Sequence, residues 1–133
     1  MSDVAEKLPN PAEQFSVSKP ETSGFEEGLR GYMVYRDLGI AKATGGKVLA
    51  HIVKARQAEE ENLGEHFHTL DFQMVYGLKG WAKFWYEGVG EVLIEPGTCI
   101  YQPPGIRHCE LAHSADFEVL EICMPADFGT SNV

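Results

Sequence analysis

The chain is dominated by short β-type runs, with no convincing helical segment between them. From about residue 31 onward, runs rich in Val, Ile, Phe, Tyr and Trp alternate with turns marked by Gly and Pro. Strands are predicted at residues 32–35, 47–54, 71–78, 81–86, 91–94, 99–102 and 117–122. So many short strands predict an all-β sandwich or a closed barrel, because closure removes the exposed strand edges.

Length and punctuation predict one domain with an N-terminal arm. A chain of 133 residues is long enough to bury one core. Residues 1–30 lack periodicity and are rich in turn-forming Pro and Gly, so we expect an arm that lies on the barrel or on a partner subunit. A tip without fixed structure is the alternative. Residues 31–133 are expected to form the barrel.

Charge and composition exclude several classes of partner. The net charge is −9, from 20 acidic residues against 11 Lys and Arg, which argues against binding to nucleic acid. No apolar run approaches the roughly 20 residues that span a bilayer, so we expect no membrane insertion. The first residues carry no signal-peptide pattern, which predicts a cytoplasmic location. In that compartment Cys99, Cys109 and Cys123 are expected to be buried small hydrophobic residues.

The sequence His66-Phe67-His68 places two imidazoles on one face of an extended segment, because side chains alternate along a strand. Two such histidines can share one metal ion. The pair alone is a weak signal, since a chain with five histidines produces this spacing by chance fairly often.

A second block, GTCIYQPPGIRH, covers residues 97–108. Pro103 and Gly105 favour a tight turn, because Pro restricts its own φ and Gly accepts conformations that other residues avoid. The turn is expected to present His108 from a rigid corner. With the histidine pair, it predicts that His66, His68 and His108 converge on one divalent transition-metal ion.

These blocks resemble the two motifs of the cupin superfamily, G(x)5HxH(x)3–4E(x)6G and G(x)5PxG(x)2H(x)3N. Here the first motif reads His66-x-His68-x4-Gln73-x6-Gly80, and the second runs from Gly97 to His108. The resemblance covers about residues 45–125. It implies a single jelly-roll β-barrel that holds one metal ion, either Fe, Mn, Ni or Zn. The three histidines and Gln73 would be the ligands, and the resemblance also implies a homodimer.

Three positions depart from the motifs. Glu60 stands where the first motif opens with Gly, and Ala112 stands where the second ends with Asn. Gln73 replaces the usual Glu; its amide oxygen can coordinate a metal but carries no charge. A divalent metal with three neutral imidazoles and Gln73 keeps a charge of +2 rather than +1, which favours an anionic ligand such as an enolate or a carboxylate. Alternatively Gln73 stays unbound, which leaves a site of three histidines.

Four further residues close to the motifs carry weaker signals, and two of them have more than one interpretation. Asp71 is a hydrogen-bond acceptor for a metal-ligating histidine, an alternative metal ligand, or a solvent-facing acid at a strand end. Arg107 either meets an anionic substrate or lies on the surface. His51 is expected to point into the barrel without being a ligand. His113 lies in a polar stretch and is expected to be solvated.

The resemblance implies a small metal-binding protein of small-molecule metabolism, of the dioxygenase type, that acts on an enolisable or phenolic substrate. A metal-dependent isomerase or lyase belongs to the same class and remains open. A non-catalytic barrel that binds or senses a small molecule is the main alternative. A barrel without metal is the least consistent with three well-placed histidines.

Overall fold

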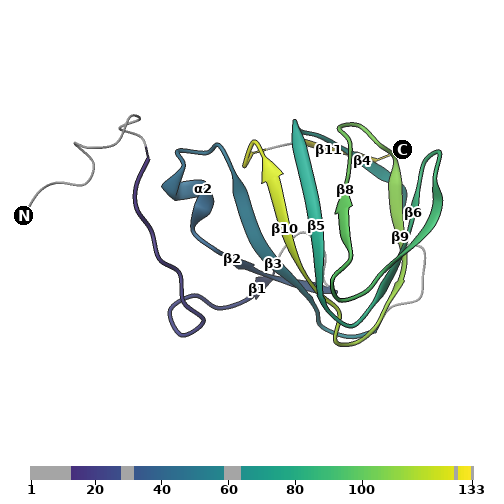
Figure 1. Cartoon of the computed structure of the whole chain (residues 1–133), viewed down its shortest axis with the longest axis horizontal. Coiled ribbons are helices and arrows are strands. Elements are labelled where there is room, and N and C mark those ends of the chain that lie inside the picture. The colour runs from purple at the N-terminus through teal and green to yellow at the C-terminus, as the bar shows by residue number, and fades with distance from the viewer. Residues whose placement is uncertain (1–12, 28–31, 59–63, 128, 133) are drawn as a thin grey trace, which may run out of the picture.

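Two antiparallel sheets form the body of the protein in the computed structural model, which describes residues 13–27, 32–58, 64–127 and 129–132. The larger sheet has the order β1-β2-β3-β10-β5-β8, and the smaller sheet has the order β11-β4-β9-β6-β7. Figure 1 shows most of the larger sheet side by side across the molecule. The strands of the larger sheet are β1 (Glu26–Glu27), β2 (Met33–Asp37), β3 (Leu49–Ala55), β10 (Glu118–Met124), β5 (Phe72–Lys79) and β8 (Cys99–Tyr101). Those of the smaller sheet are β11 (Gly129–Asn132), β4 (His66–Thr69), β9 (His108–His113), β6 (Ala82–Tyr86) and β7 (Gly90–Ile94).

The all-β prediction is confirmed, and every run predicted from the sequence overlaps an observed strand. The sequence did not single out β1, β9 or β11, which are short or begin inside a turn-rich stretch. The sequence analysis also missed the four-residue helix α2 (Ile40–Ala43). This helix begins after Gly39, whose own backbone is in the left-handed conformation. No helix among the described residues is long and apolar enough to cross a membrane.

The core lies between the inner faces of the two sheets. Val53, Val75 and Val119 come from the larger sheet, while Ala82 and Ile94 come from the smaller one, and all are buried. Their alternation with exposed residues along each strand follows from the strand period of two. Several residues of this core also line the cavity described below, together with polar residues that face inward.

A β-bulge interrupts the pairing of β6 with β9. Lys83 pairs with Ala112, whereas the next residue, Phe84, pairs with Glu110, so Leu111 is the extra residue of β9. A bulge shifts the alternation of the strand that carries it. Glu110 and His113 are three positions apart, yet both side chains are therefore buried on the inner side.

The described part of the predicted arm lies against the barrel. Glu13 forms an ion pair of 2.6 Å with Lys47, and Gln14 N donates to Ala43 O at 2.8 Å. Further along, β1 adds to the edge of the larger sheet beside β2. The predicted boundary after residue 30 falls outside the described residues, so the division into arm and barrel stays a prediction.

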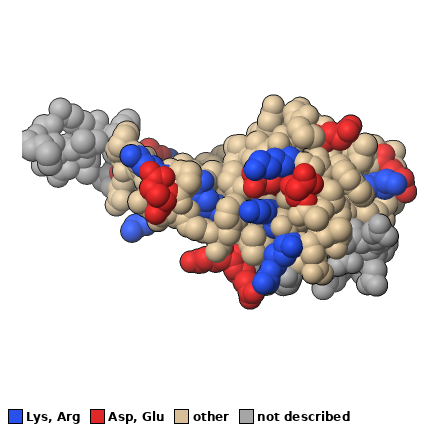
Figure 2. All heavy atoms as spheres, turned by 90° about the horizontal axis from the view of Figure 1, so that it is seen from below, with Lys and Arg blue, Asp and Glu red and all other residues tan. Residues whose placement is uncertain are grey.

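The charged surface is mixed rather than segregated on the face drawn in Figure 2. There Lys and Arg side chains lie next to Asp and Glu side chains, and neither sign forms one continuous patch.

Candidate metal centre

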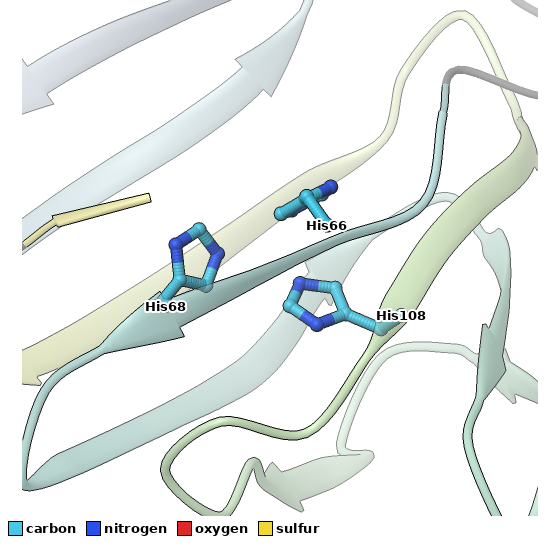
Figure 3. A group of neighbouring side chains, drawn as sticks. All are labelled: His66, His68 and His108. Carbon is cyan, nitrogen blue, oxygen red and sulfur yellow. The ribbon is translucent and has the colours of Figure 1, made fainter. Parts of the chain in front are cut away.

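Three histidine side chains meet on the inner side of the smaller sheet. His66 and His68 come from β4, and His108 is the first residue of β9. One ring nitrogen of each lies within 4.8 Å of the others, and Figure 3 shows the three rings facing one another. His66 and His108 are directly opposite in the antiparallel pairing of the two strands. The structure thus brings together the three histidines that the sequence singled out.

Backbone carbonyl groups orient two of these rings. His66 Nδ1 lies 3.3 Å from Gly64 O, and His108 Nδ1 lies 3.1 Å from Ile106 O. Because a carbonyl oxygen can only accept a hydrogen bond, each Nδ1 must carry the proton. The lone pair of each neutral ring is then on Nε2, which is the arrangement in which proteins present histidine to a metal.

The turn before β9 is tied to the strand that carries the histidine pair. Gly105 N donates to His68 O at 3.1 Å, and Gly105 has a φ of 77°, which glycine adopts without the steric cost of a Cβ. The Pro-Gly turn therefore sets the position of His108 relative to His68, as its sequence predicts.

The donor set fits a transition-metal ion. Imidazole nitrogens bind such ions at about 2.1 Å, which sets neighbouring ligand nitrogens roughly 3.0–3.4 Å apart. Starting from separations within 4.8 Å, small side-chain rotations close the three nitrogens on one ion. Three imidazoles suit Fe, Ni or Zn and leave further coordination positions open.

Gln73 lies on β5 with its side chain buried in the same cavity. Its Nε2 donates to Glu121 Oε2 at 2.8 Å. Since the amino end of the amide is engaged with a carboxylate, the carbonyl oxygen is the end that remains to meet a ligand in the cavity. Its role as a metal ligand stays a prediction.

Glu121 is a functional candidate that we did not identify from the sequence. It accepts the hydrogen bond from Gln73, and its Oε1 lies 2.6 Å from His51 Nε2, which therefore donates. Burial raises the pKa of the Glu121 carboxyl, but the hydrogen bond and charge of His51, the Gln73 amide and the nearby His68 outweigh it, so the pKa is lowered. Glu121 has the same strand parity as the buried Val119 and Cys123 of β10, and an acid on that core-facing side was the available signal.

The three histidines, Gln73 and Glu121 line a cavity of about 800 Å³. Its other walls include apolar residues of both sheets, among them Val53, Phe84 and Ile94, and residues of the described arm, from Ser18 to Glu27. His51 also lines the cavity, so its side chain points into the barrel as the sequence predicts. Arg107 and Asp71 are exposed and do not line it, so the surface interpretation holds for both.

Solved structures of similar shape identify the fold. The polyketide cyclase RemF from Streptomyces resistomycificus matches with a TM-score of 0.70 at 15% identity, over 90% of this chain and 86% of that one. An RmlC-like cupin from Shewanella frigidimarina matches with a TM-score of 0.62 at 16% identity, over 86% and 95% of the chains. This protein has a cupin fold. A salicylate 1,2-dioxygenase from Pseudaminobacter salicylatoxidans also matches, with a TM-score of 0.61 at 10% identity, over 78% of this cupin and 31% of that chain.

Sequence comparison adds nothing to this likeness. No protein-family model and no curated protein matches this chain.

A second polar pair lies deep in the cupin barrel. Glu110 and His113 are both buried, and the Glu110 carboxylate is in hydrogen-bond contact with His113 Nδ1. His113 Nε2 lies 2.7 Å from Gln57 O and must donate to it. The expectation that His113 is solvated was wrong, because the bulge at Leu111 turns this side chain inward.

Tyr86 contacts both His108 and Gln102, which line the cavity. Its hydroxyl donates to Gln102 Oε1 at 2.6 Å, and its ring stacks on His108 with the centroids 5.6 Å apart. Burial raises the pKa of the Tyr86 hydroxyl, and the charge of Glu121 raises it further. Tyr86 therefore keeps its proton and fixes the Gln102 amide with its oxygen toward the hydroxyl.

The cysteines of this cupin divide into two kinds. Cys109 and Cys123 are buried, as the sequence predicts, and burial together with the Glu121 charge raises the pKa of the Cys123 thiol. Cys99 is exposed on β8, where the expectation of burial was wrong. Its side chain points to the outer face of the sheet because it occupies the parity opposite to Ile100.

Proposed function

We propose that this cupin binds one divalent transition metal through His66, His68, His108 and Gln73 and acts as a metal-dependent enzyme on a small molecule. The observation that carries the proposal is the position of the histidine cluster, which opens into a cavity large enough for a small substrate. A purely structural metal would occupy a closed site instead.

The reaction that we propose is of the dioxygenase type. When bound, the metal supplies a Lewis acid that stabilises negative charge on a substrate oxygen. Val53, Val75 and Ile94 line the cavity and exclude water from the substrate. Gln102 lines the cavity, and the hydrogen bond from Tyr86 fixes its amide, so Gln102 offers a fixed polar group against which a substrate can be oriented. The fold likeness to a salicylate dioxygenase is consistent with this class.

The charge of the cavity restricts the substrate. Among the described residues, no Lys or Arg lines the cavity, whereas five carboxylates do: Glu26, Glu27, Asp37, Glu110 and Glu121. A carboxylate or phosphate of the substrate that does not bind the metal would meet repulsion from these carboxylates without a basic partner. We therefore propose an uncharged or cationic phenolic or enolisable compound, whose only negative charge develops at the oxygen that faces the histidines.

Oxygen consumption tests this function. Iron-loaded protein is incubated with uncharged 1,3-diketones and catechols while dissolved oxygen is recorded, and His108→Ala serves as the control. Consumption that needs both substrate and His108 supports the proposal. No consumption with any of these compounds by a protein that retains its iron overturns it.

A metal-dependent isomerase or lyase is the second candidate, favoured by His51, Glu110 and Glu121 in the cavity wall. Glu121 with His51, and Glu110 with His113, are proton-carrying pairs of the kind that proton-transfer reactions use. Exchange of substrate C–H protons in D₂O, followed by NMR without oxygen, would support this candidate. Tight binding with neither exchange nor oxygen consumption would instead indicate a small-molecule-binding or sensing protein.

We also propose that the protein is a cytoplasmic homodimer. The outer face of the larger sheet carries exposed apolar side chains on neighbouring strands: Tyr76, Leu78, Tyr101 and Met124. Such a patch on an otherwise charged surface favours association with a second copy.

A further inference from the structure

We infer that Glu121 supplies the carboxylate that position 73 lacks, by holding Gln73 in its ligating orientation and by lowering the charge of the metal site. This inference rests on the proposed metal site, and it concerns a residue outside the motif positions. It accounts for the presence of a neutral amide at a position where the cupin motif has an acid.

The pairing of β10 with β5 places the two side chains next to each other. Gln73 is opposite Cys123, and Val75 is opposite Glu121, so Gln73 and Glu121 are diagonal neighbours on the inner face. Diagonal neighbours are about 7–8 Å apart at the backbone, a gap that two long side chains can bridge. They do so with the 2.8 Å hydrogen bond from Gln73 Nε2 to Glu121 Oε2.

This hydrogen bond selects one of two orientations of the Gln73 amide. Only the oxygen of an amide can coordinate a metal cation, because the amino group is a donor without a lone pair to offer. The Glu121 carboxylate can only accept a hydrogen bond, and within the Gln73 amide only the amino group can donate one. Glu121 therefore draws the amino end toward β10 and leaves the oxygen to the cavity.

His51 fixes Glu121 from the other side. The two residues are directly opposite in the pairing of β3 with β10, and His51 Nε2 lies 2.6 Å from Glu121 Oε1. A chain of hydrogen bonds thus runs His51–Glu121–Gln73 across three adjacent strands. Since both oxygens of Glu121 are held, its charge has a defined position beside the histidine cluster.

The position of this charge changes what a substitution at Gln73 does. Considered alone, Gln73→Glu adds a carboxylate to the ligand set and should tighten metal binding. With Glu121 at hydrogen-bond distance, it instead opposes two carboxylates, and their repulsion offsets the gain. Exchanging the two residues, in Gln73→Glu/Glu121→Gln, restores one donor and one acceptor and moves the negative charge to the ligand position.

Four proteins test the inference: the wild type, Gln73→Glu, Glu121→Gln and the exchanged double variant. Metal affinity is measured by competition with a chelator, and the ligand field is read from the visible absorption of the Co²⁺-loaded proteins. We expect Glu121→Gln to bind metal about 10–100-fold more weakly, as residues that orient metal ligands usually do. If the two residues acted independently, the fold-changes in metal affinity of the two single variants would multiply in the exchanged variant. Because they act as a pair, the exchanged variant should bind metal at least tenfold more tightly than that product predicts.

Glu118→Gln is the matched control, since Glu118 lies on the same strand and makes no described hydrogen bond to Gln73. It should leave metal affinity and the Co²⁺ spectrum unchanged. If Glu121→Gln fails to fold, the comparison of Gln73→Glu with the exchanged variant gives the same information. Wild-type affinity in Glu121→Gln, or single effects that multiply to within threefold in the double variant, overturns the inference. Unchanged metal content in His66→Ala would instead refute the metal site itself.

Discussion

The buried pair of Glu110 and His113 allows a sharp prediction about stability. Replacing His113 by leucine removes the partner of a buried carboxylate and the donor to Gln57 O. Breaking one side of a buried ion pair usually costs about 3–5 kcal/mol, because the remaining charge is left without compensation. For a domain of 133 residues this corresponds to a fall in Tm on the order of 10–20 °C.

The double variant Glu110→Leu/His113→Leu separates the pair from simple packing. It leaves no buried charge at positions 110 and 113. The leucine at position 113 would pack against the rings of Tyr32 and Phe117, whose centroids lie 5.8 and 6.0 Å from that of the imidazole it replaces. The hydrogen bond to Gln57 O is also lost, at about 1 kcal/mol. We therefore expect the double variant to be more stable than His113→Leu by roughly 2–4 kcal/mol in urea titrations. A single variant that loses less than about 1 kcal/mol, or a double variant that is less stable than the single, would refute the reasoning.

Three further results are expected. His66→Ala/His108→Ala should lose nearly all bound metal while its β-type circular dichroism persists; full metal occupancy would contradict the site. Deletion of residues 1–19 or the substitution Tyr101→Glu should shift the protein toward a monomer on a sizing column, and an unfolded truncation would show that the arm belongs to the core. Finally, Glu121 has a lowered pKa when folded, so its contribution to stability is complete above its ordinary value of 4.5 and is lost as the pH falls through the folded pKa. The stability difference between the metal-free wild type and Glu121→Gln should therefore shrink below pH 4.5, and a constant difference in acid would contradict this assignment.

The cupin barrel and its histidine cluster could be read from local patterns. Strand alternation places His66 and His68 on one face, and the Pro-Gly turn determines where His108 begins its strand. Both signals depend on residues within a few positions of one another. For that reason the sequence identified all three histidines before any contact between the strands was known.

The surroundings of the cluster depend on contacts between residues far apart in the chain. Gln73 and Glu121 are 48 positions apart, and their hydrogen bond exists only because β5 and β10 are neighbours in a particular register. Sequence alone identifies the missing charge at position 73, but it does not show which strand carries the replacement. Register is decided by how both sheets bury their apolar faces together.

The burial of His113 was likewise decided by the tertiary structure. Strict alternation from His108 would place Glu110 on the inner face and His113 on the outer one. One extra residue, Leu111, opposite β6 reverses that parity and turns His113 into the core. A bulge is set by the pairing of two strands rather than by either strand alone, so the local sequence determined that β9 would alternate, and only the packed sheet determined where the alternation would shift.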